Sequence, residues 1–594
     1  MKKLLTIIIL LALHCGVNAQ TSIPAGSIST ATWTQAGSPY LINGNITISN
    51  YLKIEPGVEV ILQGFYQIKV SGNLRAIGTS SQRITFKIND TTGWHNDISP
   101  VGGWRGIYFD QLFGTDSSEL RYCVIKDVKH GVNAPQNDNA AIFSYYRGFR
   151  ISYCEFYHNQ SSANQSVGNI IVGSLNQNKT FELDHCNIHD NDTRVGVFKM
   201  DTYVGGFLKI HDNRFHHNTG AGAVFTLWSE MIFENNELDS NTCTAVNFGT
   251  LRVDGGHNII RNNKLHHNSN LRMAAIACTM GKTTIEKNLI CNNQMLDASC
   301  GATDGGAAIH VSHNNNAPWD STEYIIRDNI IANNFADYFG AGVYIFSCKV
   351  WISNNHFIKN KTTMDGAAIN AFGNDNQIYM QNNIFYGNES TNYGLKKDVR
   401  IAIGNKYSFD YNWMEYPFYN MVDASLINRI GDTIHNVIGS TPALLNPTTI
   451  CGPSDNALLK DFHLTSSSTC INAGDIQNIT TSATDFYGTA RISGPKIDIG
   501  ANEFVFNIPE SVKDVDDFFV QVYPNPSNNV VIIEMEKASD YTITLLDFSG
   551  KKVFQHQEVS SKISVNVDAI PSGIYVLTVA DKEGKMITRK ISKN

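Results

Sequence analysis

Residues 213–218 read N-R-F-H-H-N, residues 263–268 read N-K-L-H-H-N, and residues 355–360 read N-H-F-I-K-N. Each segment places one apolar residue inside a polar turn that begins and ends with asparagine. The pattern [C/N]-x-[F/I/L/M]-x-x-[N/D] recurs eleven times between Cys123 and Asn412, at intervals of 31, 32, 27, 23, 27, 25, 41, 26, 28 and 29 residues. A repeat of this length without a heptad or an amphipathic helix indicates a solenoid of stacked coils.

A second apolar segment, introduced by small residues, accompanies most repeats. It reads A-A-I at Ile142, Ile276, Ile309 and Ile369. Short β-branched runs broken by Asn, Gly and Asp predict strands rather than helices. A repeat of about 27 residues then makes three short strands and three turns, and successive coils pair at roughly 4.8 Å. Because one coil cannot bury its apolar face alone, stacking creates the core.

Asparagine recurs at two turn positions, where its amide can hydrogen-bond the backbone and the asparagine of the next coil. In the first three coils, cysteine takes the place of asparagine, which predicts a stack of small buried thiols. The first column is Asn213, Asn236, Asn263, Asn288, Asn329, Asn355 and Asn383, preceded by Cys123, Cys154 and Cys186; the second is Asn159, Asn191, Asn218, Asn241, Asn268, Asn293, Asn334, Asn360 and Asn388.

On these motifs the chain resembles the right-handed parallel β-helices of the pectate-lyase-like superfold, over residues 30–500. The paired F-x-x-N and G-G-A-A-I motifs (residues 305–309) are also similar to repeats of polymorphic outer-membrane autotransporter adhesins. The resemblance implies an all-β fold, but it leaves the activity open, because this superfold includes lyases, hydrolases, epimerases and non-enzymatic adhesins.

The ends of the chain differ from the repeats. Residues 1–19 are predicted to be a signal peptide, with a basic start, an apolar stretch and small residues before Gln20. Residues 20–110 are expected to cap the solenoid and form its first coils, followed by repeats over 111–430. Residues 431–508 resemble the closing segment of "choice-of-anchor Q" surface proteins, and their Asp485, Arg491, Asp498 and Glu503 are expected to hold down the last coil.

After a charged linker at 509–518, residues 519–594 predict about seven short strands in a small, immunoglobulin-like β-sandwich. This part resembles the type A sorting domain of the Bacteroidetes type IX secretion system, which implies export through the periplasm to the surface or the medium, with the secretion machinery as partner. No catalytic role is assigned to it. The motif residues are Tyr523, Pro524, Asn525 and Pro526 at its start, and Gly573 and Tyr575 near its end.

The composition of the chain argues against some classes of function. The chain has 46 basic and 54 acidic residues, a formal net charge of −8, and it contains no basic patch or aromatic RNA motif, so nucleic acid is not the expected partner. After the signal peptide no apolar run is long enough for a transmembrane helix, and a monomer is expected. In an exported chain, Cys451 with Cys470 and Cys291 with Cys300 are candidate disulfides, with buried free thiols as the alternative.

The irregular 41-residue interval between Asn288 and Asn329 predicts a functional site. Its two long loops flank the strand that carries His310, and they could wall a cleft. Trp319 is a candidate sugar-stacking platform, and histidine is the usual proton shuttle near neutral pH. The candidate catalytic residues are His310, His313, Asp304 and Asp320; the candidate substrate-binding residues are Trp319, Tyr344 and Asn370. The alternative is a solvated insertion without function.

Metal binding has little support in the sequence. His189, His216 and His266 share one turn position, and His158, His217 and His267 the next, but no known metal-ligand spacing accompanies them. Lys199, Asp201 and Arg194 form a third group, because lyases of this superfold use Lys or Arg as base beside acidic Ca²⁺ ligands. No such acidic set is recognisable, so neither a metal site nor a cofactor is assigned, and Ca²⁺ enters only if the protein is a lyase.

Three hypotheses remain open. The first is a secreted or surface-displayed β-helix protein that binds a glycan, as an adhesin does. The second is a polysaccharide lyase or glycoside hydrolase acting at His310. The third is a structural spacer.

Overall fold

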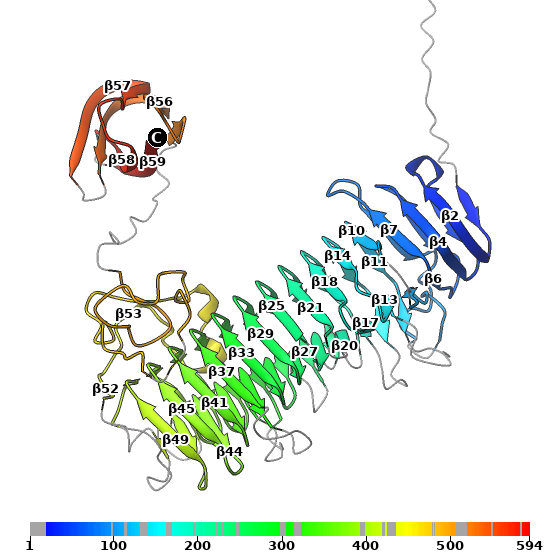
Figure 1. Ribbon diagram of the computed structural model, residues 1–594, viewed down its shortest axis with the longest axis horizontal. Coiled ribbons are helices and arrows are strands. Elements are labelled where there is room, and N and C mark those ends of the chain that lie inside the picture. Colours follow the sequence, from blue (N-terminus) through cyan, green and yellow to red (C-terminus); the bar gives the residue numbers. More distant parts are fainter. Residues whose placement is uncertain are drawn as a thin grey trace, which may run out of the picture. The chain divides into compact units, whose positions relative to one another are not determined.

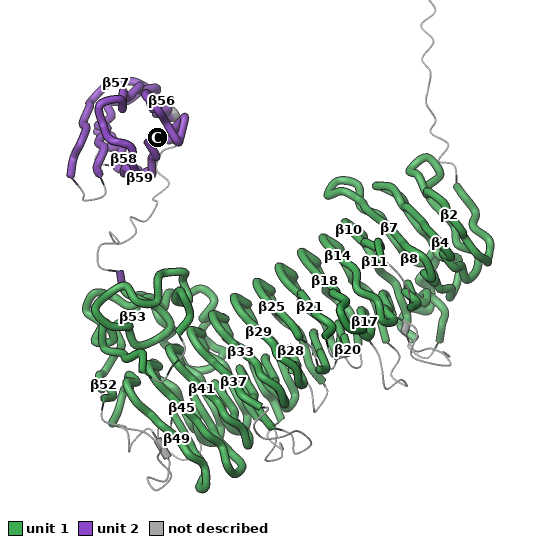
Figure 2. Tube along the Cα trace, in the orientation of Figure 1, with its two compact units in different colours: residues 1–504 green, residues 505–594 purple. Residues whose placement is uncertain are grey.

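The computed structural model describes residues 20–593 except 97–98, 112–115, 131–139, 162–168, 194–195, 203–204, 221, 229, 245–248, 298–304, 314–321, 392–397, 418–421, 424–434, 478, 480, 506–519, 548–550 and 583–584. The predicted signal peptide lies outside the described residues. The chain divides into two compact units, residues 1–504 and 505–594 (Figure 2). Within the described residues, no helix is long and apolar enough to cross a membrane.

The first unit is a stack of parallel coils (Figure 1). A typical coil has four strands, β20 (Gly196–Thr202), β21 (Phe207–His211), β22 (Arg214–His216) and β23 (Thr219–Gly220), one more than the sequence predicts. Each strand pairs in parallel with its counterpart in the next coil, as β20 does with β24 and β22 with β26. The parallel β-helix predicted from the repeat is therefore confirmed.

The coils form four ladders, which we number in the order in which the chain enters them. Ladders I and II belong to one 27-stranded sheet, joined by β2 (Gly26–Trp33) and β4 (Ile46–Ile54). Ladder I continues with β6 (Ile68–Val70), β9 (Ile107–Phe109), β13 (Ile142–Tyr145), β17 (Asn169–Leu175), β20, β24 (Val224–Leu227), β28 (Leu251–Asp254), β32 (Ile276–Thr279), β36 (Ile309–Ser312), β40 (Val343–Phe346), β44 (Ile369–Phe372), β48 (Val399–Ile401) and β51 (Val422–Asp423). Ladder II contains β7 (Asn73–Ile77), β10 (Glu119–Arg121), β14 (Arg150–Ser152), β18 (Thr180–Asp184), β21, β25 (Glu230–Glu234), β29 (His257–Arg261), β33 (Lys282–Glu286), β37 (Glu323–Arg327), β41 (Lys349–Ser353), β45 (Gln377–Gln381) and β49 (Lys406–Asp410).

Ladder III is a separate 16-stranded sheet, and ladder IV consists of two-residue strands. A short 3-10 helix, η1 (Gln35–Gly37), lies near the start of the stack. Ladder III contains β1 (Thr21–Ile23), β3 (Tyr40–Ile42), β5 (Glu59–Leu62), β8 (Ile84–Ile88), β11 (Cys123–Lys126), β15 (Glu155–Tyr157), β19 (Asn187–His189), β22, β26 (Glu237–Asp239), β30 (Lys264–His266), β34 (Leu289–Cys291), β38 (Ile330–Ala332), β42 (His356–Ile358), β46 (Ile384–Tyr386), β50 (Trp413–Met414) and β52 (Val437–Ile438). Ladder IV contains β12 (Lys129–His130), β16 (Gln160–Ser161), β23, β27 (Thr242–Cys243), β31 (Ser269–Asn270), β35 (Gln294–Met295), β39 (Phe335–Ala336), β43 (Lys361–Thr362) and β47 (Glu389–Ser390).

The core is made by the apolar residue of each repeat. Phe215 pairs in register with Leu238, and Phe357 with Phe385, whose rings stack with centroids 5.1 Å apart. These side chains are fully buried. Because side chains alternate between the two faces of a strand, the residues on either side of each core residue point outward.

Two columns of asparagine hold the turns on either side of ladder III. Asn334 shows the pattern: its Oδ1 accepts from the backbone N–H and the side-chain amide of Asn293, at 3.1 and 3.0 Å. Its own amide donates to Ile290 O and to Asn360 Oδ1, at 2.9 and 3.0 Å. The residue before each ladder asparagine has a left-handed backbone, as Asn333 does at φ 56°, a conformation in which Asn, Asp and His are enriched.

The predicted thiol stack is present at the start of the first column. The backbone N–H of Cys123 lies 3.4 Å from the sulfur of Cys154, whose own N–H lies 3.4 Å from the sulfur of Cys186. All three side chains are buried free thiols.

The expected disulfides are not formed in the described part of the chain, where Cys291, Cys451 and Cys470 are free thiols. Cys451 directs its sulfur at Gly387 O, 2.9 Å away, whereas Cys470 is buried in an apolar cluster with Trp413. The two thiols therefore point into different environments, and the predicted Cys451–Cys470 disulfide is wrong. Cys300 lies outside the described residues.

The closing segment does not continue the coils but folds back over the outer face of ladder III. There the outward residues of β34, β38, β46 and β50 are apolar, and they form a second core with the closing segment. Left-handed turn asparagines hold it in place: Asn292 donates to Asp455 O at 2.8 Å and Asn333 to Ile450 O at 2.7 Å. The segment contains β53 (Leu444–Asn446), η4 (Gly452–Ser454), η5 (Ala457–Leu459) and β54 (Asp461–Leu464).

A buried ionic group anchors the end of this segment. Arg491 is 2% exposed and pairs with Asp328 of the coil stack at 3.3 Å and with Glu503 at 3.4 Å. Beside it, His356 is fully buried, and neither ring nitrogen has a hydrogen-bond partner among the described residues. Burial, with Arg491 and His463 nearby, lowers the pKa of His356 to about 3.

The second unit is an antiparallel sheet with its own core. It has five strands instead of about seven, because two of them are long and continue where shorter strands were expected. They are β55 (Val520–Tyr523), β56 (Val530–Leu546), β57 (Lys552–Asn566), β58 (Gly573–Asp581) and β59 (Met586–Lys593). Tyr523 bonds Glu534 and Asn525 donates to Lys590 O, so these two motif residues join the start of this unit to β56 and β59. Tyr575 of β58 donates to Pro571 O in the turn before its own strand.

We expect Asn334→Ala to lower the free energy of unfolding by about 3 kcal/mol, because the backbone N–H of Asn293 loses its acceptor while buried and the amide's own hydrogen bonds are lost as well. Urea denaturation followed by far-ultraviolet circular dichroism measures this. Asn374→Ala, at an exposed turn, is the matched control and should change stability by less than about 0.5 kcal/mol. Equal effects of the two substitutions would contradict the assigned role of the column.

His356 predicts a pH-dependent stability. Its pKa is about 3 in the folded chain against an ordinary 6.5, so the unfolded chain binds the proton more readily and stability falls as pH drops below 6.5. Linkage gives a loss of about 2 kcal/mol between pH 7 and pH 5 from this residue. His356→Ile matches the neighbouring Ile330 and Ile384 of the same column and should remove that part of the slope. An unchanged difference between denaturation at pH 5 and pH 7 would refute the assignment.

Candidate functional site

The structure places three of the predicted site residues in one column. His310, Tyr344 and Asn370 are register partners on the outward side of β36, β40 and β44 in ladder I. The rings of His310 and Tyr344 stack with centroids 5.4 Å apart. Asp304, Trp319 and Asp320 lie outside the described residues.

These three outward residues are nevertheless buried. A Cβ on Gly305 would lie 2.6 Å from the Tyr344 ring, and one on Gly366 would lie 3.0 Å from Asn370 Cβ. The glycine-rich turns therefore cover the column closely, which explains the small residues of the G-G-A-A-I motif. His310, Tyr344 and Asn370 are at most 1% exposed.

Burial also changes the chemistry of His310. It lowers the pKa of the imidazole to about 4, so the ring is neutral at pH 7. Nδ1 lies 3.1 Å from Gly305 O, and the buried Nε2 has no hydrogen-bond partner among the described residues. His313 is half-buried and bonds Thr322 Oγ1 at 3.0 Å. The prediction that His310 transfers protons to a polysaccharide does not agree with this arrangement, because the covering turns separate the His310 side chain from solvent.

Ladder I is more open several coils toward its start. Lys199 and Asp201 of β20 point outward and pair at 3.6 Å. Two coils further along, Arg252 of β28 donates hydrogen bonds to Asp254 from its Nε and Nη2, at 3.0 and 2.7 Å. Phe225 of β24 lies between the two cations, with its ring centroid 5.8 Å from Lys199 Nζ and 5.2 Å from the Arg252 guanidinium. We call these five residues the cationic step.

The carboxylates of the cationic step lie in a shielded environment. Desolvation raises the pKa of Asp201 despite the nearby Lys199 ammonium, and it raises the pKa of Asp254 despite Arg252. Asp201 Oδ1 has no hydrogen-bond partner among the described residues, while 39% of the Asp201 side chain remains exposed. The oxygen without a partner is itself buried, so the exposed fraction belongs to the rest of the Asp201 side chain.

An exposed tryptophan borders the cationic step. Trp228 follows β24 in a left-handed turn at φ 54° and is 57% exposed. A Cβ on Gly255 would lie 2.6 Å from Trp228 Cε3, so the indole rests directly on the glycine of the next coil. Its backbone is held by Thr202 and Asp254. The ring is thus oriented before any ligand binds.

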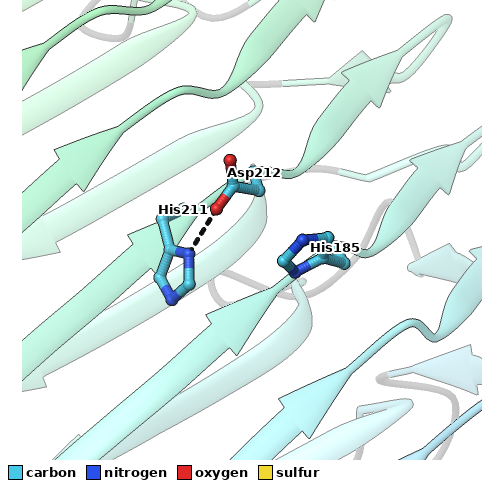
Figure 3. Close-up of side chains that lie close together, drawn as sticks. All are labelled: His185, His211 and Asp212. Carbon is cyan, nitrogen blue, oxygen red and sulfur yellow. Dashed lines mark hydrogen bonds and ion pairs between the residues drawn. The ribbon is translucent and has the colours of Figure 1, made fainter. Parts of the chain in front are cut away.

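The histidine columns are present: His158, His189 and His266 bond carboxylates, and His216 bonds His217 and Asn187. His189 and His216 stack with centroids 4.9 Å apart, and Asp239 separates His216 from His266 in register. The close group His185, His211 and Asp212 is shown in Figure 3, where His211 Nδ1 bonds Asp212 at 2.7 Å. The other close groups of metal-ligand type are Glu182, Asp184 and His211, and Glu237, Asp239 and His266.

Arginine and lysine already bond the carboxylates of the last two groups, whereas Asp212 of the first group bonds His211. Arg150 bonds Asp184 at 2.7 Å, Lys209 bonds Glu182 at 3.0 Å, and Arg214 bonds Asp239 at 2.9 Å. A divalent ion would have to displace these cations, so we assign the last two groups to a ladder of surface ion pairs.

The sequence contained a signal for the cationic step. Lys199 and Asp201 have a K/R-x-D spacing, which Arg252 and Asp254 repeat two coils later. Trp228 gave no periodic signal, because its importance depends on exposure.

Comparison with known proteins agrees with this architecture. Residues 105–251 match the family model for the right-handed β-helix region, and residues 521–594 match that for the secretion system C-terminal sorting domain. No curated protein matches the chain. One solved structure, the enzymatically active domain of tailspike protein 2 of bacteriophage CBA120, aligns at 9% identity over 97% of this chain and 73% of the tailspike chain, with a TM-score of 0.17.

At that TM-score the alignment carries no structural argument, and the assignment follows from the family models and the observed coils. The predicted surface or extracellular localisation is confirmed by the sorting domain. The chain is therefore an exported right-handed parallel β-helix protein that ends in a sorting domain of the type IX secretion system.

Proposed function

We propose that the protein binds a polysaccharide outside the cell, on the part of ladder I formed by the cationic step and Trp228. The observation that carries the proposal is the exposed Trp228 ring, which contacts Gly255 directly after Asp254 of the cationic step. An indole face packs against the C–H face of a sugar ring, while carboxylate, ammonium and guanidinium groups hydrogen-bond its hydroxyls.

The rigidity of the stack supports this proposal. Lys199, Phe225 and Arg252 are on consecutive strands of one parallel sheet, so their spacing is set by backbone hydrogen bonds. A preorganised surface loses little entropy on binding. Because the ladder continues over many coils, an extended polymer suits this surface better than a small ligand.

Trp228→Ala should weaken binding about tenfold, because it removes the stacking surface. Glycan-array screening of residues 20–594 would first identify a bound polysaccharide, and isothermal titration calorimetry would then compare the variants. Trp351→Ala is the matched control, since Trp351 lies half-buried on the outer face of ladder II. No binding to any glycan, or equal losses in both variants, would count against the proposal.

Glycoside hydrolysis is a second candidate function, favoured by one observation: burial raises the pKa of Asp201, as a general acid requires. Asp254 lies two coils away in the same column, roughly 9.6 Å at β-strand spacing, close to the separation of carboxylates in inverting enzymes. Its bidentate bond to Arg252 opposes a role as base.

The two functions differ in their products. If the protein hydrolyses the polysaccharide that it binds, reducing ends accumulate and Asp201→Asn lowers their rate at least a hundredfold. If it only binds, no reducing ends form, and Asp201→Asn changes affinity alone. A reducing-end assay on the glycan identified by the array decides between them, with Asp375→Asn at an exposed turn of another coil as control.

A further inference from the structure

A hollow lies where the closing segment meets ladder III. It has a volume of about 270 Å³ and lies at the point where the outward residues of this ladder change from charged to apolar. The coil stack supplies Lys264, Lys287 and Leu289, and the closing segment supplies Lys460, Phe462 and Tyr487. We call it the lysine pocket.

The charge of the lysine pocket is positive. Its described lining contains three lysines and no carboxylate. Lys460 pairs with Asp455 at 3.0 Å, and Lys287 donates to Thr484 Oγ1 at 2.5 Å. Among the described residues no carboxylate lies within ion-pair distance of Lys264.

The register neighbour of Lys264 does not neutralise it. Glu237 precedes Lys264 in ladder III, but its carboxylate bonds His266 at 3.2 Å and lies 4.0 Å from Arg214. Two of the three ammonium groups therefore face the hollow without a carboxylate partner, and an anion entering it would form charge-assisted hydrogen bonds.

The opposite wall is apolar and aromatic. The ring of Tyr487 stacks on His463 with centroids 3.6 Å apart, and its hydroxyl accepts from the backbone N–H of Phe462 at 3.3 Å. These contacts fix the ring while leaving 37% of Tyr487 exposed. Leu289 completes the apolar side, which an inorganic anion would leave uncovered.

We propose that the lysine pocket binds a carboxylate-bearing sugar residue, with the carboxylate at Lys264 and Lys287 and the ring against Tyr487. Its volume of about 270 Å³ lies just below the range of about 300–1,000 Å³ for small-molecule sites, which suits a single sugar ring. The proposal takes the saccharide class from the proposed function but concerns a different surface, on ladder III and the closing segment.

The test is calorimetric titration of residues 20–594 with a uronate trisaccharide, a neutral trisaccharide of equal length and inorganic phosphate. We expect the uronate to bind at least about tenfold more tightly than either of the others, and its affinity to fall with added salt. Lys264→Gln should weaken uronate binding about tenfold, since it removes a charge-assisted bond. Lys264→Arg should retain most of the affinity, and Lys406→Gln, an exposed lysine of ladder II, should retain all of it.

The same titration in Trp228→Ala separates this site from ladder I. Uronate binding that survives Trp228→Ala but is lost in Lys264→Gln supports the lysine pocket whether or not the ladder I proposal holds. The inference is overturned if the uronate does not bind, if the neutral trisaccharide or phosphate binds equally well, or if Lys264→Gln has no effect. Because Lys264 is exposed, the thermal unfolding midpoint of Lys264→Gln should match that of the parent chain.

Discussion

The hydrogen bond from one turn asparagine to the next is the interaction on which the rest of this structure depends. The column asparagines bond the backbone N–H of the preceding column residue, a carbonyl of the preceding coil and the next asparagine, as Asn334 does. Asn388, the last of its column, donates to Asp398 instead. The preceding residue has a left-handed backbone that turns the chain, and the asparagine side chain hydrogen-bonds the backbone groups that the turn leaves without partners. A buried turn without these partners would be destabilising, so the column makes sharp, stackable corners possible over many coils.

Once the corners are fixed, the outer faces of the ladders are free to vary. On ladder III they are charged in the earlier coils, where Arg214 and Glu237 face water, and mostly apolar from Leu289 onward, with the buried His356 as an exception. The closing segment covers the apolar stretch, held by asparagines of the left-handed turns. The change from charged to apolar outward residues along ladder III thus produces a second core, with the lysine pocket at its border.

Ladder I shows a similar contrast. Glycine-rich turns press on His310, Tyr344 and Asn370 and exclude water from them, whereas Asp201 and Trp228 remain accessible several coils earlier. The same small residues that mark the repeat in the sequence therefore close one part of the ladder. A side chain on the outward side of a strand is exposed only if the adjoining turn leaves room for it.

The sequence by itself determined the solenoid, the asparagine and cysteine columns and the C-terminal sorting domain, because each depends on residues at fixed spacing and on local hydrogen bonding. It did not determine which outward residues meet solvent. That depended on how turns such as Gly305–Gly306 lie on neighbouring coils, and on where the closing segment folds back. The apolar outward residues of β34 and β38 were visible as runs such as N-I-I-A, but their partner lies more than a hundred residues away. The exposure of the outward residues, the approach of lysines from distant parts of the sequence and the burial that lowers the pKa of His310 and His356 all depend on packing. Only the tertiary structure decided them.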